Sequence, residues 1–394
     1  MKRSIPWLAA MGLVLSFTLA VCAANNQPIV VGASLSLTGP FQRQALDEKT
    51  GYEMWVSEVN AHSGLLGRQV QLKIYDDQSD PATSAKLYER LITQDKVDLI
   101  LGPYATGVTA AAANVAEKYH YVMIAPGASA ASIFVAPYKY RFQGMSSQLQ
   151  LAQLFISLAK AKGMKTVAVI GPNNSFGQEI IDGTILAAKD HGLKVVFQEE
   201  YPADTKDMSS IILKMKQRNP DVVAAAAYLP DSILLIQQSK ELNFAPKMLD
   251  AGPVGPLLDD FVKTLGRDAE DILGVGQWDA SAASNGNETF VKMYKTQHLG
   301  QAPSYAVATA YQAGLILQQA IEKAGSLDQE KIRQAVLSMN FQGPFGGFKV
   351  NQSGAQVAHR GVIIQIQNGR RVTVWPKEIA DGQVVVPIPS WTGR

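Results

Sequence analysis

The chain has 394 residues, of which 47% are apolar, and this length and composition suit two domains that each bury a core. The formal net charge is only +2 at pH 7, which argues against nucleic acid or an anionic membrane surface as a partner. The five histidines are scattered singly, with no HExxH pattern. We therefore expect no metal site and no cofactor.

The first 24 residues predict an export signal. A positive start at Lys2 precedes an uncharged apolar stretch, residues 7–21, which is followed by small residues. The stretch is shorter than the roughly 20 residues that span a bilayer. Cleavage after residue 23 or 24 would remove Cys22, the only cysteine, and leave a periplasmic chain without thiol chemistry. Alternatively, Cys22 is the lipid-carrying first residue of a lipoprotein, although Val21 fits that site poorly.

From residue 28, short β-branched runs alternate with longer helical stretches. Asp80 and Pro81 provide an N-cap and a first-turn proline for one of the helices. The first series is predicted as strand 29–36, helix 47–60, strand 70–75, helix 81–92, strand 97–101, helix 108–118 and strand 121–125. This alternation is typical of a parallel sheet with helices on both faces.

A second series of the same kind follows residue 147. Its predicted elements are helix 149–162, strand 166–170, helix 177–191, strand 195–199, helix 208–218, strand 222–227, helix 231–242 and strand 247–250. The last third holds predicted helices at 287–298, 304–323 and 331–338 and short strands at 346–350, 361–366 and 371–375. These strands are too few for a third sheet, so we expect them to complete the two earlier units.

The predicted fold class is therefore α/β, with two Rossmann-like, doubly wound lobes joined by a hinge of several chain crossings. The crossings are expected near residues 142–146, 276–281 and 348–352. Lobe 1 would comprise residues 25–143 and 280–349, and lobe 2 residues 144–279 and 350–394. Such a hinge permits opening and closing and little other motion.

Catalytic motifs are missing from the sequence. No GxxxxGK[ST] or GxGxxG segment occurs, and residues 127–131 carry a serine without the glycine that a nucleophile elbow requires. We therefore expect a protein that is not an enzyme.

Two loops after consecutive predicted strands, residues 102–108 and 125–130, carry the most informative polar residues. Thr106 and Ser129 fall where a helix N-cap belongs. Helix N-termini attract anions, so two of them that converge would form a carboxylate site. The alternative is that each hydroxyl only caps its own helix.

The sequence resembles the type I periplasmic binding proteins of the leucine/isoleucine/valine group over nearly the whole mature chain. The markers are residues 31–40 (VGASLSLTGP), 60–67 (NAHSGLLG), 75–81 (YDDQSDP), 100–103 (ILGP), 125–127 (APG) and 219–223 (NPDVV). The resemblance implies two lobes that close over a small carboxylate or amino acid. It also implies a monomer that docks on the membrane permease of an ABC importer.

The resemblance also implies site residues. The hydroxyls of Thr106 and Ser129 would hold the ligand carboxylate, together with Gly127, which lies in the loop of Ser129. The aromatic residues Tyr228 and Phe176 would close on the ligand from the second lobe. Members of the family carry an aromatic residue in the opening loop of the first lobe, and Gln44 stands at that position in this sequence. The wall of the cleft that this loop forms is therefore expected to be polar, unless Phe41 takes the place of the aromatic residue. Other aromatics that could line the cleft are Tyr104, Trp278 and Tyr305.

One departure from the family pattern concerns the acid that pairs with the ligand ammonium. In the family this acidic residue follows the last strand of the second lobe. The corresponding residues 250–255 read DAGPVG here, and their only acid, Asp250, lies a few residues before the family position. Because a buried ammonium without a partner is costly, we expect a ligand with a carboxylate and no ammonium, such as an aromatic or aliphatic acid. The competing function is a ligand-sensing receptor of the same fold that feeds a signalling partner.

Overall fold

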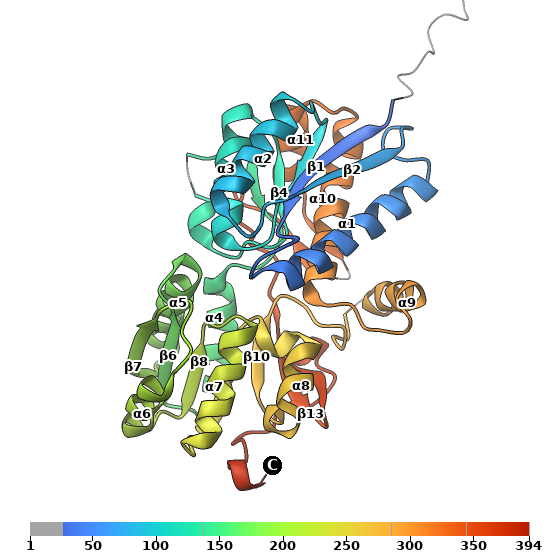
Figure 1. Cartoon of the computed structure of the whole chain (residues 1–394). Helices are drawn as coiled ribbons and strands as arrows, with labels where there is room; N and C mark the ends of the chain where they lie inside the picture. Colours follow the sequence, from blue (N-terminus) through green and yellow to red (C-terminus); the bar gives the residue numbers. More distant parts are fainter. Residues whose placement is uncertain (1–26, 136, 285, 344, 394) are drawn as a thin grey trace, which may run out of the picture.

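The computed structural model describes residues 27–393 except 136, 285 and 344. The predicted export signal and Cys22 lie outside the described residues. Figure 1 shows two α/β lobes joined by several chain segments. The predicted class, two doubly wound lobes with a multi-crossing hinge, is confirmed. No helix within the described ranges has the length and apolar character needed to cross a membrane.

The first lobe is built on a parallel sheet with strand order β2-β1-β3-β4-β5. Its strands are β1 (Ile29–Leu35), β2 (Val70–Asp76), β3 (Leu99–Leu101), β4 (Met123–Ala125) and β5 (Arg141–Gln143). Its helices are α1 (Gln42–Ala61), α2 (Pro81–Thr93), α3 (Thr106–Tyr119), α10 (Tyr305–Ala324) and α11 (Gln329–Leu337). Helices cover both faces of the sheet (Figure 1), so almost every residue of β1 is buried.

The second lobe has a sheet of order β14-β13-β10-β9-β8-β6-β7. Its strands are β6 (Thr166–Pro172), β7 (Lys194–Tyr201), β8 (Val222–Ala225), β9 (Met248–Asp250), β10 (Leu273–Gly276), β13 (Val362–Gln367) and β14 (Arg370–Trp375). Its helices are α4 (Gln148–Ala161), α5 (Ser175–His191), α6 (Ser209–Arg218), α7 (Leu229–Glu241) and α8 (Asp259–Leu265). The strands β13 and β14 are antiparallel additions to a parallel core.

Most predicted elements are found, and Asp80 caps α2 by accepting a 2.7 Å hydrogen bond from the Thr83 N–H. Helix α1 begins at Gln42 rather than at residue 47, because residues 42–46 contain no helix breaker. The strands β5 and β10 and the helix α8 were not predicted. The strand β5 contains a single apolar residue, β10 contains two glycines, and α8 has fewer than two turns, so none of the three shows a clear strand or helix pattern.

The last third of the chain returns to both lobes. Strands β13 and β14 extend the second sheet, as expected. The strand predicted at 346–350 does not join either main sheet, which corrects the prediction: β12 (Gly346–Phe348) pairs only with β11 (Phe341–Gly343). Helix α9 (Asn287–Gln297) precedes α10, which packs tightly against α1. Gly314 permits this approach, since a Cβ there would overlap the ring of Trp55.

The chain passes between the sheets after β5, after β10 and between β12 and β13. Gly354 still lies on the first lobe, where its carbonyl accepts a 2.9 Å hydrogen bond from the Gln143 N–H. His359 then reaches the backbone of Gln277. The residue limits given above for the two lobes remain a prediction.

Candidate functional site

A small cavity of about 30 Å³ lies between the lobes, beyond the carboxyl ends of the strands. The lobes are in contact around it. Arg43 of α1 pairs with Asp260 of α8 at 3.2 Å, and Glu179 of α5 accepts hydrogen bonds from the first lobe at Ala131 (2.7 Å) and Ser132 (3.0 Å). The cavity is lined by Tyr104, Ala105, Thr106, Gly127, Ser129, Met145, Gln148, Phe176, Tyr228, Pro253, Val254, Gln277 and Tyr305.

Five helices direct their N-terminal ends at this cavity. Thr106, Gln148 and Tyr305 are the first residues of α3, α4 and α10. Phe176 is the second residue of α5, and Tyr228 is the N-cap of α7. Each N-terminus carries a partial positive charge, while none of the lining residues named above has an ionisable acid or base other than tyrosine. The cavity is therefore electrostatically suited to an anion and unsuited to a cation.

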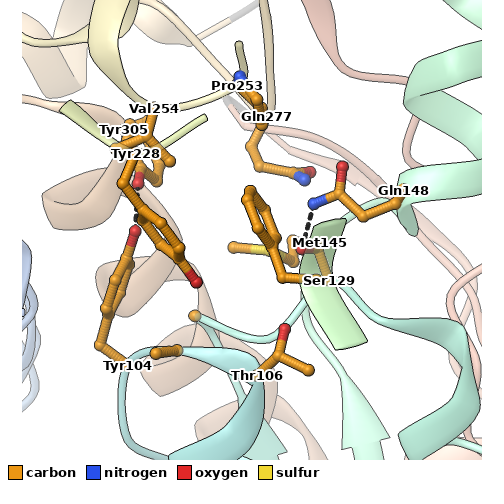
Figure 2. Close-up of a pocket in the computed structure, with 13 residues that line it drawn as sticks. Tyr104, Thr106, Ser129, Met145, Gln148, Tyr228, Pro253, Val254, Gln277 and Tyr305 are labelled. Carbon is orange, nitrogen blue, oxygen red and sulfur yellow. Dashed lines mark hydrogen bonds between the residues drawn. The ribbon is translucent and has the colours of Figure 1, made fainter. Parts of the chain in front are cut away.

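The Thr106 hydroxyl is available to a ligand, because it does not cap its helix. The N-cap of α3 is Ala105, which has φ 72°, and no side-chain capping bond is present. The prediction that Thr106 is an N-cap is thus wrong by one residue. Figure 2 shows its side chain at the base of the cavity.

Ser129 also lines the cavity, but it is not an N-cap either. Its hydroxyl accepts a hydrogen bond from the Gln148 side-chain amide, and its carbonyl accepts one of 3.0 Å from the Gln148 N–H (Figure 2). The segment after it is a single 3-10 turn, Ala131–Ile133, and Glu179 occupies its N–H groups. The prediction that Ser129 is a helix N-cap is therefore wrong, since only a three-residue 3-10 turn with Ala130 as its N-cap follows it.

Aromatic rings form the other wall of the cavity. The hydroxyls of Tyr104 and Tyr305 share a 2.7 Å hydrogen bond. Phe176 and Tyr228 stack with ring centroids 4.7 Å apart. Phe41 adds a ring against Tyr228, at 5.5 Å, from the opposite lobe. These rings provide apolar surface for a flat or branched ligand and join the two lobes.

Three predicted ligand contacts lie elsewhere. Gln44 is buried in α1 and does not line the cavity. Phe41 packs behind the rings of Tyr104 and Tyr228, where it supports the wall without lining it. Trp278 is only 2% exposed and packs within the protein, with its indole N–H donating to Asn287 at 2.9 Å.

Asp250, the candidate partner of a ligand ammonium, lies outside this cavity as well. It lines a separate cavity of about 20 Å³ that shares only Gln148 and Pro253 with the first. Burial raises the pKa of Asp250 to about 8, although its carboxyl accepts backbone hydrogen bonds from Gly252 and Val275. The group is therefore mostly protonated at pH 7 and offers no negative charge to the ligand.

Six lining residues were not predicted from the sequence: Ala105, Met145, Gln148, Pro253, Val254 and Gln277. Met145 and Gln277 lie in two of the predicted lobe crossings, so the crossings themselves were the signal that could have identified them. Pro253 and Val254 follow the last strand predicted in the second series. Only the three-dimensional arrangement places Gln148 against Ser129.

A buried acid, Glu48 of α1, lies directly behind the Gly127 loop. The side chain is fully buried, and neither carboxyl oxygen has a hydrogen-bond partner among the described residues. Burial, followed by the charge of Asp77, raises its pKa well above the usual value. A Cβ on residue 127 would overlap Glu48 Oε1, which explains the glycine there. Glu48 thus supports the loop as a neutral acid.

Comparison with known proteins identifies the family. Residues 28–371 match the family described as Periplasmic binding protein. A Leu/Ile/Val-binding protein homolog from Brucella suis is 26% identical, over 96% of this chain and 98% of the relative.

Solved structures share the fold. A leucine-binding protein from Thermotoga maritima is 24% identical with a TM-score of 0.80, over 88% of this chain and 98% of that one. A solute-binding protein of an ABC transporter from R. palustris, in complex with benzoate, is 20% identical with a TM-score of 0.78, over 91% of this chain and 98% of that one. These matches cover most of both lobes. The chain therefore belongs to the periplasmic binding protein family, a family of solute-binding proteins and not of enzymes, as a type I member of the leucine/isoleucine/valine-binding group.

Proposed function

We propose that this protein is the extracytoplasmic solute-binding component of an ABC importer and that it captures a small monocarboxylate without an ammonium group. An aromatic acid such as benzoate is the first candidate. The competing ligand class is a branched-chain amino acid, which carries an ammonium group. The observation that carries the proposal is the cavity between the lobes, where five helix N-termini meet and no side chain of an acid or a base is present.

A carboxylate fits this cavity because it would accept hydrogen bonds from the Thr106 hydroxyl and the Gln148 amide. It would also be attracted by the partial positive charge of the helix N-termini. Charge-assisted hydrogen bonds of this kind are stronger than neutral ones. An ammonium group would face the same positive helix ends without a counter-charge, since Asp250 has a pKa of about 8 and lines another cavity. Leaving an ammonium buried and unpaired costs several kcal/mol.

The rest of the ligand would contact rings. Phe176 and Tyr228 are already stacked, and Tyr104 lies on the opposite lobe. The present cavity of about 30 Å³ has room for a water molecule and not for a benzene ring. We therefore propose that the lobes open to admit the ligand and that the ligand then favours a closed form in which the rings pack against it.

The relatives bear on the choice between the two ligand classes. One related structure contains benzoate, and curated relatives are named for leucine, isoleucine and valine. Both classes supply the carboxylate that the helix ends favour, and they differ in the ammonium. The ammonium is therefore the group that an experiment needs to vary.

The test is calorimetric titration of the mature protein with benzoate, cyclohexane carboxylate, leucine and benzylamine. We expect binding of the two ammonium-free acids and none of benzylamine. Thr106→Ala combined with Ser129→Ala should weaken benzoate binding by at least 10-fold, equivalent to about 1.4 kcal/mol. Ser239→Ala, which removes a buried hydroxyl from the distant part of α7, is the control and should bind normally.

Leucine binding without benzoate binding would refute the choice of ligand class. Binding that survives the loss of both hydroxyls would place the carboxylate elsewhere.

A further inference from the structure

Gln277 has an unusual position, because it lines the cavity and also lies on one of the chain crossings between the lobes. It follows β10 directly and is 5% exposed. Its side chain is held by two hydrogen bonds to one backbone residue, Ser146. The Ser146 N–H donates to Gln277 Oε1 at 2.8 Å, and Gln277 Nε2 donates to the Ser146 carbonyl at 3.0 Å.

Ser146 belongs to a different crossing, the one that leads from β5 to α4. The Gln277 amide therefore forms the same pair of hydrogen bonds with this crossing that a neighbouring β-strand would form. Both bonds are buried, where an unpaired amide or carbonyl is costly. The first and second crossings are thus joined through one side chain.

The third crossing is joined to the same residue. His359, located between β12 and β13, contacts the Gln277 carbonyl through Nε2 at 2.8 Å. A carbonyl can only accept, so Nε2 carries the proton in this contact. His359 is itself 2% exposed, and burial lowers its pKa, so the ring stays neutral and the contact does not depend on protonation near pH 7.

We propose that Gln277 is the positioning residue that couples occupancy of the cavity to rotation of the lobes. All three crossings meet at this residue, and its side chain faces the ligand cavity. A ligand that presses on Gln277 therefore acts on the hinge directly. This role is independent of which carboxylate the cavity binds, and it goes beyond the proposed function.

The test compares Gln277→Met with the unaltered protein. Methionine keeps the length and volume of the side chain and removes both hydrogen bonds to Ser146. Hydrogen exchange is measured on the unliganded proteins at residues 144–147, 277–280 and 357–361, and small-angle scattering reports the separation of the lobes. We expect exchange at residues 144–147 and 277–280, which lose the bonds between Gln277 and Ser146, to become at least 10-fold faster and the lobe separation to broaden. Exchange at residues 357–361 should change less, because the Gln277 carbonyl that His359 contacts is retained.

Gln365→Met is the matched control. Gln365 Nε2 donates to the carbonyls of Asp271 and Val385, and its Oε1 accepts from the Val385 N–H, so its amide is also paired with backbone, but inside the second lobe. This variant should lose stability without changing exchange at the crossings. Wild-type exchange in Gln277→Met, or equal loosening of the crossings in Gln365→Met, would overturn the proposal.

A second measurement uses benzoate and leucine as probes. Whichever of them binds should slow exchange at the crossings in the unaltered protein and should fail to do so in Gln277→Met. If neither binds, the proposed ligand class fails, while exchange in the unliganded proteins still decides the role of Gln277.

Discussion

The stability of this protein should decrease as the pH rises from 5 to 7, in part because of Asp250. The carboxyl is buried in the second lobe, and burial raises its pKa to about 8. An unfolded chain has an aspartate pKa of about 3.9. Between these two values the folded protein holds a proton that the unfolded chain has released. Raising the pH therefore favours the unfolded chain.

The magnitude follows from the window between the two pKa values. Each pH unit within the window changes the free energy of unfolding by about 1.4 kcal/mol for one group. From pH 5 to pH 7 the Asp250 contribution therefore decreases by about 3 kcal/mol. Asp250→Asn removes the titrating group and keeps its size, so the variant should lose this part of the pH dependence. At pH 7 it should be more stable relative to wild type than at pH 5, by about 3 kcal/mol.

The assay is urea denaturation of the wild type and the variant at pH 5, 6 and 7. Asp221→Asn is the control. Partial burial acts to raise the pKa of Asp221, but hydrogen bonds from Lys247 and from backbone N–H groups outweigh it and lower the pKa to about 2. Asp221 is thus ionised in both states at these pH values, and its replacement should cost the same at each. Parallel stability curves for Asp250→Asn and wild type would refute the reasoning.

Three further predictions concern residues around the site. Glu179→Gln removes the charge that holds residues 131 and 132 across the cleft and should raise the ligand dissociation rate about 10-fold, as stopped-flow fluorescence would reveal; an unchanged rate would show that this contact does not hold the closed form. Glu48→Gln should reduce the decrease in stability with rising pH above about pH 4.5, because burial raises the pKa of Glu48 and the folded state keeps a proton that the unfolded chain releases. Denaturation of the variant and the wild type at pH 5 and 8 tests this, and an equal decrease in both would contradict it. Gly314→Ala should destabilise the first lobe by about 1–3 kcal/mol through overlap with Trp55, and a thermal melt equal to that of wild type would contradict this packing.

Motifs, periodicity and the family resemblance predicted the fold and several of the residues that line the cavity. Alternating strand and helix patterns predicted both sheets, and loop positions predicted Thr106 and Ser129 near one point. The family resemblance added the rings of Phe176 and Tyr228, which line the same cavity. This worked because parallel strands bring all their carboxyl ends to one edge. The elements β5, β10 and α8 were missed because β5 has one apolar residue, β10 has two glycines and α8 has fewer than two turns.

The sequence by itself determined the two-lobe architecture, the family and the loops that face the cleft, since these depend on local hydrophobic patterns and on turn residues. Only the tertiary structure decided which side chains meet. It moved Asp250 into a neighbouring cavity, placed Gln148 against Ser129 and joined three crossings at Gln277. These contacts connect residues as many as 131 positions apart, and local patterns carry no information about pairs at that separation.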